Sequence, residues 1–133
     1  MGILNLTQHR SSKEQRNDGV VDLNDADYEQ LQELLTFDEL PDIGLMYHRA
    51  QMIRKLAKNE HNYKHLTVML GGAPFFMALL ERYLYDDGFG HKIVYSFSKR
   101  VSEEYTDGDG KVIKTNIFKH IGFVKPIVEI PRG

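Results

Sequence analysis

The chain of 133 residues contains no cysteine. That absence excludes a disulfide framework, thiol chemistry and a zinc site with cysteine ligands. Long apolar runs are absent as well, because no run approaches the roughly 20 residues that cross a bilayer. The first residues lack the basic segment and the long apolar stretch of a signal peptide. We therefore expect a cytoplasmic protein that has no membrane partner.

The net charge of the chain is small but unevenly distributed. It is −2 at pH 7, yet residues 92–133 carry eight basic and five acidic side chains. This excess favours a small anionic ligand over a long nucleic acid, which usually needs a larger basic surface. An ordinary solvated face gives the same count. Hydrophobic residues make up 41% of the chain, which fits one globular domain over residues 1–133, whose tail (126–133) is either loose or covers a neighbour.

The apolar pattern alternates between strands and helices. Short apolar runs predict strands at residues 3–7, 19–23, 66–70 and 93–98. Helical spacing and capping residues predict a short helix after Ser11 or Ser12, then helices after Asn24, from Pro41 and over residues 75–84, the last ended by Asp87-Gly88. Residues 101–105 and 112–118 predict a hairpin around a turn at 107–110. This order predicts an α/β fold with a mostly parallel sheet, helices on both faces and a C-terminal β-hairpin.

Two adjacent glycines, Gly71 and Gly72, separate a buried-looking strand from a helical pattern that opens at Pro74. Glycine lets the backbone turn sharply and approach another group, because no Cβ blocks it. Proline suits the first position of a helix. The free N–H groups at such a helix start form an anion site, and phosphate is the usual anion. An ordinary strand-to-helix connection that binds nothing explains the pattern equally well.

Three loops follow predicted parallel strands, so we expect them to meet at the carboxyl edge of the sheet, where such sheets bind ligands. They are Thr7, Gln8 and His9; Gly71, Gly72 and Ala73; and Ser98, Lys99 and Arg100, with Ser96 on the preceding strand. The glycine amides would hold a phosphate, and Lys99 or Arg100 would offer fixed positive charge. His9 could titrate near neutrality, and the hydroxyl groups could donate hydrogen bonds. Alternatively, Lys99 and Arg100 simply end a strand as solvated charges.

Patterns for metal and serine chemistry are weak in this chain. His61 and His65 lack the glutamate that lies between the two histidines of a metalloprotease helix. Ser96 and Ser98 lie on a predicted strand rather than at a strand-to-helix turn, so the pattern predicts no activated serine. We expect neither a metal nor another cofactor.

Three segments of the C-terminal third carry a resemblance to a known family. Residues 94–100 form a serine-rich strand that ends in Lys99-Arg100, residues 109–112 contain a DG turn, and residues 117–123 contain a Phe-x-His-x-x-Phe pattern. Together they resemble a small CRISPR-associated family of CARF-like proteins. The resemblance extends loosely to Gly71-Gly72 and to residues 5–9, and the two middle helices have no counterpart in it.

The resemblance implies a Rossmann-like homodimer that binds cyclic oligoadenylate across its two-fold axis. It further implies a ring nuclease, which opens this messenger and switches off type III CRISPR signalling. A ribose 2′-OH would attack its neighbouring phosphate in line, without a metal. Lys99, Arg100 or the Gly72-Ala73 amides would stabilise the phosphoryl oxygens, and His9 or His120 would move a proton, the latter only if the hairpin folds back.

Two alternatives from other functional classes stay open at the level of sequence. One is a non-catalytic sensor or sponge that binds the same cyclic ligand. The other is an unrelated nucleotide- or phosphate-binding module of a mobile element, in which the C-terminal similarity is accidental.

Overall fold

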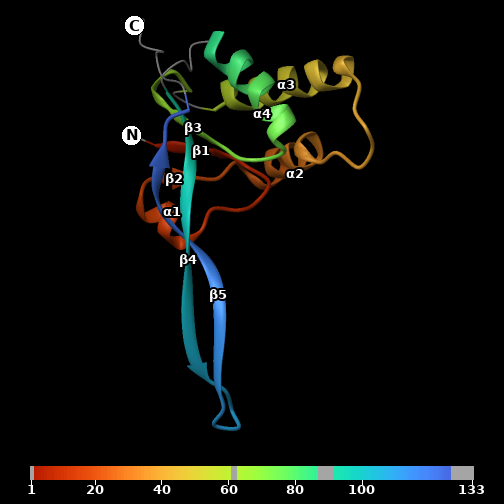
Figure 1. The fold of residues 1–133 in the computed structure, drawn as a ribbon. Coiled ribbons are helices and arrows are strands. Elements are labelled where there is room, and N and C mark those ends of the chain that lie inside the picture. The colour runs from red at the N-terminus through yellow and green to blue at the C-terminus, as the bar shows by residue number, and fades with distance from the viewer. Residues whose placement is uncertain (1, 61–62, 87–91, 127–133) are drawn as a thin grey trace, which may run out of the picture.

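A five-stranded sheet organises the computed structural model, which describes residues 2–60, 63–86 and 92–126. Its strands are β1 (Ile3–Leu6), β2 (Val20–Val21), β3 (Thr67–Leu70), β4 (Ile93–Thr106) and β5 (Val112–Val124). The helices are α1 (Lys13–Asn17), α2 (Asp25–Leu35), α3 (Ile43–Lys58) and α4 (Pro74–Leu84), with a 3₁₀ turn, η1, at Tyr63–His65. The strand order is β2-β1-β3-β4-β5, and β5 alone among the described strands is antiparallel to its neighbour (Figure 1). The predicted mixed α/β fold with a mostly parallel sheet and a C-terminal hairpin is confirmed.

Local polar signals set the helix starts where the sequence predicts them. The Ser12 hydroxyl accepts a hydrogen bond from the Gln15 amide, and the Gln15 side chain accepts one from the Ser12 amide. This reciprocal pair is a capping box, which satisfies two otherwise unpaired N–H groups of α1. Asn24 caps α2 and Asp42 caps α3, each through a side-chain oxygen.

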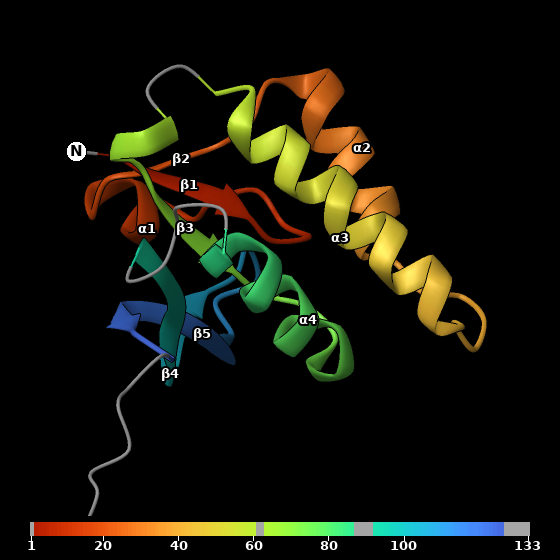
Figure 2. The ribbon, with the colours of Figure 1, turned by 90° about the horizontal axis from the view of Figure 1, so that it is seen from above.

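The larger apolar core lies between the sheet and three of the helices. Figure 2 shows α2, α3 and α4 grouped together, with α1 apart from them. Leu4 and Leu6 of β1 and Val68 and Leu70 of β3 belong to this core. Side chains alternate along a strand, so the intervening Met69 faces the other side, where it packs with Val20 and Val94. That second face is covered by α1 and by β5, which curls round to contact α1.

The hairpin is longer than predicted. The expected strand at residues 93–98 and the expected hairpin arm at 101–105 are one continuous strand, β4. Only Ile93, Val94 and Tyr95 of β4 pair with β3. Beyond them β4 pairs with β5 alone, and the two-stranded ribbon projects from the sheet (Figure 1). The predicted turn is confirmed: Gly110 has φ +81°, and the Asp107 carboxylate accepts from the amides of Asp109 and Lys111.

Some features fall outside the structural description. No helix among the described residues is both long and apolar enough to cross a membrane. Three features of the sequence analysis fall on residues outside the described ranges: the predicted helix end at Asp87-Gly88, one of the two histidines (His61), and tail residues 127–133.

Candidate functional site

The strand order reverses between β1 and β3, which lie side by side in the sheet. From β1 the order proceeds to β2 on one side, and from β3 it proceeds to β4 on the other. In sheets of this kind, ligands bind outside the carboxyl ends of the strands at such a reversal. Thr7 follows β1 and Gly71 follows β3; a Cβ built on Gly71 would lie 3.1 Å from Thr7 Cγ2. Two of the three predicted segments therefore touch at the carboxyl edge.

The buried side chain of Asn5 fixes the segment that follows β1. Its Nδ2 donates to the His9 carbonyl and to the Asp22 carboxylate, each at 2.8 Å. Its Oδ1 accepts from the Thr7 amide at 3.0 Å and from the Thr7 hydroxyl at 2.7 Å. Every polar group of the Asn5 amide is thus used, which holds Thr7 in one conformation at the edge. In the sequence, Asn5 is a polar residue between two leucines of an apolar strand. That position is a signal for a buried hydrogen-bonding side chain that the sequence analysis did not use.

Gln8 fastens the same segment to α2. Its side-chain amide donates to the Leu35 carbonyl and to Thr36 Oγ1, while its backbone carbonyl accepts from Tyr28 and Gln32. Gln8 therefore holds the loop in place, and its NH₂ group is already engaged.

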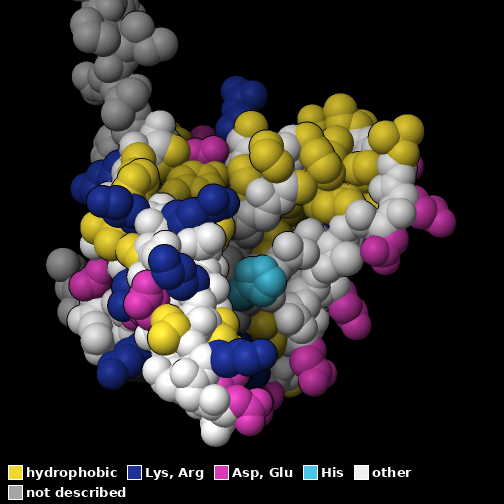
Figure 3. All heavy atoms as spheres, turned by 60° about the horizontal axis from the view of Figure 1, so that its bottom comes forward, with side chains coloured by type: hydrophobic (Ala, Val, Ile, Leu, Met, Phe, Trp, Pro, Cys, Tyr) yellow, Lys and Arg dark blue, Asp and Glu magenta, His cyan; other side chains and the backbone are white. Residues whose placement is uncertain are grey.

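His9 is exposed beside a hollow at this edge. The hollow has a volume of about 360 Å³ and is lined by Gln8, His9, Gln32 and Thr36. No hydrogen bond to the imidazole of His9 occurs within the described ranges. Figure 3, which looks toward the end from which the ribbon projects, shows Lys and Arg side chains gathered on one side, Asp and Glu along the opposite margin, and a histidine in the hollow between. A ring nitrogen at His9 is accordingly available to a ligand.

The start of α4 adjoins this edge with its N–H groups uncapped by a side chain. Ala73 is the N-cap residue and makes no side-chain cap bond, and Pro74 occupies the first turn. A Cβ on Gly72 would lie 3.1 Å from Met77 Cε. Neither Gly71 nor Gly72 is among the described glycines with positive φ. Close approach of neighbouring side chains, rather than a left-handed backbone, therefore favours glycine here.

The third predicted segment is not a loop. Ser98, Lys99 and Arg100 lie inside β4, opposite His120, Lys119 and Phe118 of β5, so the expected loop at the edge is wrong. Side chains alternate along the strand, so Lys99 points to the α4 side of the ribbon and Arg100 to the α1 side. The Arg100 guanidinium lies 5.4 Å from the Phe118 ring centroid on that second side. The two cations therefore cannot converge on one phosphate from the same strand.

His120 lies in the interior, where it joins β4, β5 and α1. Its Nδ1 lies 2.6 Å from Ser96 Oγ, and its Nε2 lies 2.9 Å from Asp18 Oδ2. The tautomer that satisfies both contacts donates from Nε2 to Asp18 and accepts from Ser96 at Nδ1. The order serine–histidine–aspartate matches that of a nucleophile relay. However, the His120 side chain is only 2% exposed, so a ligand at the carboxyl edge has no access to it.

The His120 contacts also explain the curl of the sheet. Asp18 ends α1 and is 102 residues from His120 in the sequence, and the two side chains fasten α1 to β5. The imidazole ring also packs on Phe123 at a centroid separation of 4.7 Å. We assign Ser96, His120 and Asp18 a structural role. Nothing in the spacing of the sequence identified Asp18.

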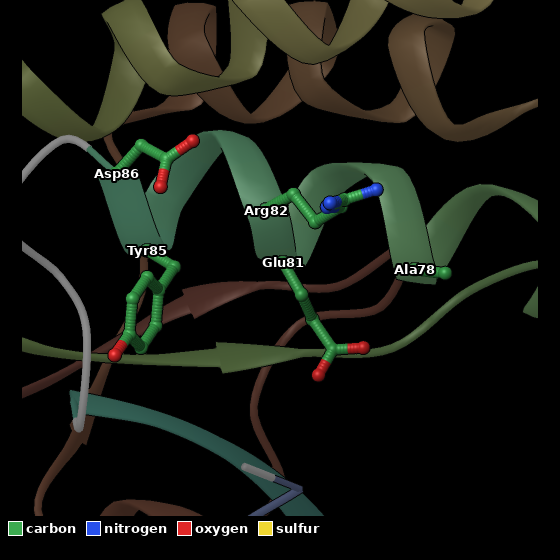
Figure 4. Close-up of a pocket in the computed structure, with 5 residues that line it drawn as sticks. All are labelled: Ala78, Glu81, Arg82, Tyr85 and Asp86. Atoms are coloured by element: carbon green, nitrogen blue, oxygen red, sulfur yellow. The ribbon is translucent and has the colours of Figure 1, made fainter.

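A separate pocket of about 510 Å³ lies along α4 (Figure 4), lined by Ala78, Glu81, Arg82, Tyr85 and Asp86. Figure 4 shows Glu81 and Tyr85 pointing toward the strands and Asp86 pointing toward the other helices. Burial raises the pKa of Glu81, and a hydrogen bond with the Tyr95 hydroxyl opposes that change. Burial and the nearby Glu81 carboxylate raise the pKa of Tyr95. The contact between Glu81 and Tyr95 thus joins α4 to β4.

Fold and edge together define a small mixed α/β protein in which the neighbouring strands β1 and β3 end in adjoining loops. Within the described residues, no group of three or more metal-ligating side chains is found. The family model for the Uncharacterized protein MJ1673 family matches residues 1–124, so the chain belongs to that family. The matched range includes the carboxyl-edge segments and the whole hairpin. No curated protein and no solved structure matches the chain.

Proposed function

We propose that this chain is a CARF-like protein with a Rossmann-like sheet, which binds cyclic oligoadenylate at the carboxyl edge and opens the ring. The observation that carries the proposal is the contact between Thr7 and Gly71 at the strand-order reversal. A crevice at this position is where open parallel sheets bind nucleotides. The resemblance of residues 92–123 to CARF-like ring nucleases supplies the class of ligand.

Three groups, one at the edge and two at the base of the projecting ribbon, suit a ligand made of phosphates and adenines. The uncapped N-terminus of α4 favours a phosphate. Lys99 projects on the α4 side of the ribbon, where it would add fixed positive charge. Phe97 lies two residues beyond Tyr95, the last residue of β4 that pairs with β3, and its side chain is on the same side of the strand as that of Tyr95. Phe97 is 54% exposed, and an exposed aromatic ring offers a stacking surface for a base.

The proposed reaction needs a proton acceptor and a group that stabilises the phosphoryl oxygens. The ribose 2′-oxygen forms a bond to the neighbouring phosphorus while the bond to the 5′-oxygen breaks, which leaves a 2′,3′-cyclic phosphate and a 5′-hydroxyl. His9 would accept the 2′-OH proton, and a proton would return to the departing 5′-oxygen. The α4 amides and Lys99 would stabilise the charge on the phosphoryl oxygens. Proton transfer is placed at His9 because His120 has neither ring nitrogen free.

A homodimer completes the proposal. A cyclic oligonucleotide has internal rotational symmetry, whereas one chain offers a single carboxyl edge. A two-fold pair of chains would present two such edges to one ring.

The test is incubation with cyclic tri-, tetra- and hexa-adenylate in EDTA, with products resolved by chromatography and mass. Linear products that end in a 2′,3′-cyclic phosphate support the proposal. His9→Gln should then reduce the rate of ring opening while binding of the ring is retained. Lys99→Ala should also reduce that rate, whereas Arg100→Ala should not. Lys114→Ala, in an exposed ion pair farther along the ribbon, is the matched control and should change nothing.

Other outcomes of the same experiment decide between the alternatives. Intact rings that co-elute with the protein would overturn catalysis and establish a sensor or sponge. Failure to bind any ring, combined with binding of a mononucleotide, would overturn the proposal in favour of a phosphate-binding module. Equal loss of activity in Lys99→Ala and Arg100→Ala would contradict the assignment of Lys99 to the site.

A further inference from the structure

The projecting part of the hairpin, residues 97–119, has two chemically different faces; we call it the arm. Side-chain contacts fix which residues share a face. Ser102 bonds Asn116, and Glu104 pairs with Lys114, on the α1 side. The α1 side is polar apart from Phe118 and Val112: it carries Ser98, Arg100, Ser102, Glu104, Lys114 and Asn116. The α4 side is mainly apolar: it carries Phe97, Val101, Tyr105, Ile113 and Ile117, with Lys99, Glu103, Thr115 and Lys119 between them.

The apolar face of the arm is exposed in the single chain. Tyr105 is 52% exposed and Ile117 is 36% exposed. Figure 1 shows the arm extending away from the helices and from the other strands. An isolated two-stranded ribbon is at best marginally stable in water. A ribbon with one apolar face gains stability when that face is covered.

The order of residues along this face is complementary to itself. From base to tip, five successive rows of the α4 side are Phe97, then Lys99 with Lys119, then Val101 with Ile117, then Glu103 with Thr115, then Tyr105 with Ile113. The sequence of rows is apolar, cationic, apolar, anionic, apolar. Reversing the ribbon about its central row leaves the apolar rows in register and exchanges the cationic row with the anionic one.

We propose that the covering partner is a second copy of this chain, with the two arms packed face to face and antiparallel. The two-fold axis passes between the central rows, perpendicular to the strands. Val101 then meets Val101 of the second copy, Lys99 meets Glu103, and Phe97 meets Tyr105. A two-fold interface must be self-complementary in this way. The opposite face of the arm has no such pattern, because its apolar residues do not exchange with one another.

The size of the face sets the strength expected of this contact. Eight residue steps separate Phe97 from Tyr105, which corresponds to about 27 Å at ~3.4 Å per residue. With a two-stranded width near ~10 Å, each copy buries on the order of 300 Å² there, less than the ~800 Å² of a standard interface. The arms alone should therefore give a concentration-dependent dimer.

Charged residues of the arm would form ion pairs across the interface. Within one chain, Glu103 already pairs with Lys119 at 3.5 Å. In the dimer Glu103 would lie between its own Lys119 and Lys99 of the second copy. Two lysines face each glutamate, so each copy keeps one lysine in excess on this face. Because the arms are antiparallel, the two carboxyl edges lie at opposite ends of this interface, so the arm contact is separate from the pair of edges proposed to share one ring. The arm contact needs no ligand, and its test is independent of the proposed reaction.

The first test uses the absence of native cysteine. Val101→Cys and Ser102→Cys place single thiols on adjacent residues that point to opposite faces. With a short bismaleimide cross-linker, Val101→Cys should give a covalent dimer at micromolar protein and Ser102→Cys should not. Equal cross-linking of the two variants, or none of Val101→Cys, would overturn the interface.

The second test measures the dimer dissociation constant by analytical ultracentrifugation without ligand. Ile117→Asp should weaken the dimer at least tenfold, while Phe118→Asp, the matched control on the opposite face, should not. Lys99→Glu and Glu103→Lys should each weaken it, and the double variant should recover most of the loss because the exchanged charges again face each other. Circular dichroism checks that each variant is folded. A double variant no stronger than either single variant contradicts the antiparallel register, whatever the chain does to cyclic oligoadenylate.

Discussion

Replacement of Gly71 by alanine tests whether the two carboxyl-edge loops touch as closely as the structure shows. The added Cβ would lie 3.1 Å from Thr7 Cγ2 and 3.5 Å from Thr7 Cβ. The first contact is a few tenths of an ångström too short, while the second is ordinary. Thr7 cannot easily retreat, because its amide and hydroxyl both bond Asn5. Overpacking of this kind costs about 1–3 kcal/mol.

Two opposing terms set the net effect of Gly71→Ala. The Gly71 backbone lies outside the positive-φ region, so alanine also reduces the entropy of the unfolded chain, a gain of about 0.4–1 kcal/mol. We therefore expect a net loss of about 1 kcal/mol in the free energy of unfolding. Thr7→Ser removes Cγ2 and keeps the hydroxyl that bonds Asn5. In that background Gly71→Ala should be neutral or slightly stabilising.

The assay is urea unfolding of the four proteins in this double-mutant cycle. We expect a coupling free energy of about 1 kcal/mol between positions 7 and 71, which is typical of residues in direct contact. Gly72→Ala provides the comparison, because its close contact is the terminal methyl of Met77, a flexible group that can move aside. Additive effects of Thr7→Ser and Gly71→Ala would refute the contact, and with it the observation that carries the proposed function.

Three further changes probe the parts that hold the edge and the ribbon in place. Asn5→Ala removes four hydrogen bonds in the interior, so it should cost about 2–3 kcal/mol in urea unfolding and speed amide exchange at Thr7. His120→Ala leaves its partners unpaired and opens a cavity, with an expected cost of about 2–4 kcal/mol by the same measurement. The raised pKa of Tyr95 means that the folded state keeps the phenol proton more tightly than the unfolded state. That stability is present below the unfolded pKa and is lost as pH rises toward the folded pKa, so urea midpoints should fall in strong alkali for wild type and fall less for Tyr95→Phe.

The sequence could predict features that depend on residues close together in the chain. Ser12 and Gln15 are three positions apart, and their types alone define a capping box. Asp107 and Gly110 likewise close a turn whose geometry is local. The alternation of apolar runs was enough to place the parallel strands and the helices between them along the chain, although not to give the order of the strands in the sheet. These signals place Thr7 and Gly71 at strand ends, and the carboxyl edge follows from the parallel arrangement.

Features set by register and by long-range packing could not be predicted in this way. The pattern of residues 93–106 does not show that one strand runs through both predicted segments, because beyond Tyr95 the strand is held only by its pairing with β5. That continuity turns Lys99 and Arg100 from neighbours in a loop into residues on opposite faces. The contact between His120 and Asp18 joins positions 102 residues apart, and only the curl of β5 brings them together.

Hydrogen bonds at the two ends of α1 connect the carboxyl edge to the base of the arm. Asp22, which accepts a hydrogen bond from Asn5, also accepts from the amide and the hydroxyl of Ser11, just before α1. Asp18 lies at the other end of α1 and holds His120 at the base of the arm. The residues that fix Thr7 therefore also fix the helix against which β5 is fastened. An apolar residue at position 120 could fill the same space, but it would pair with neither Asp18 nor Ser96. We expect the contact between α1 and β5 to weaken in such a variant, and with it the hold of α1 on the base of the arm.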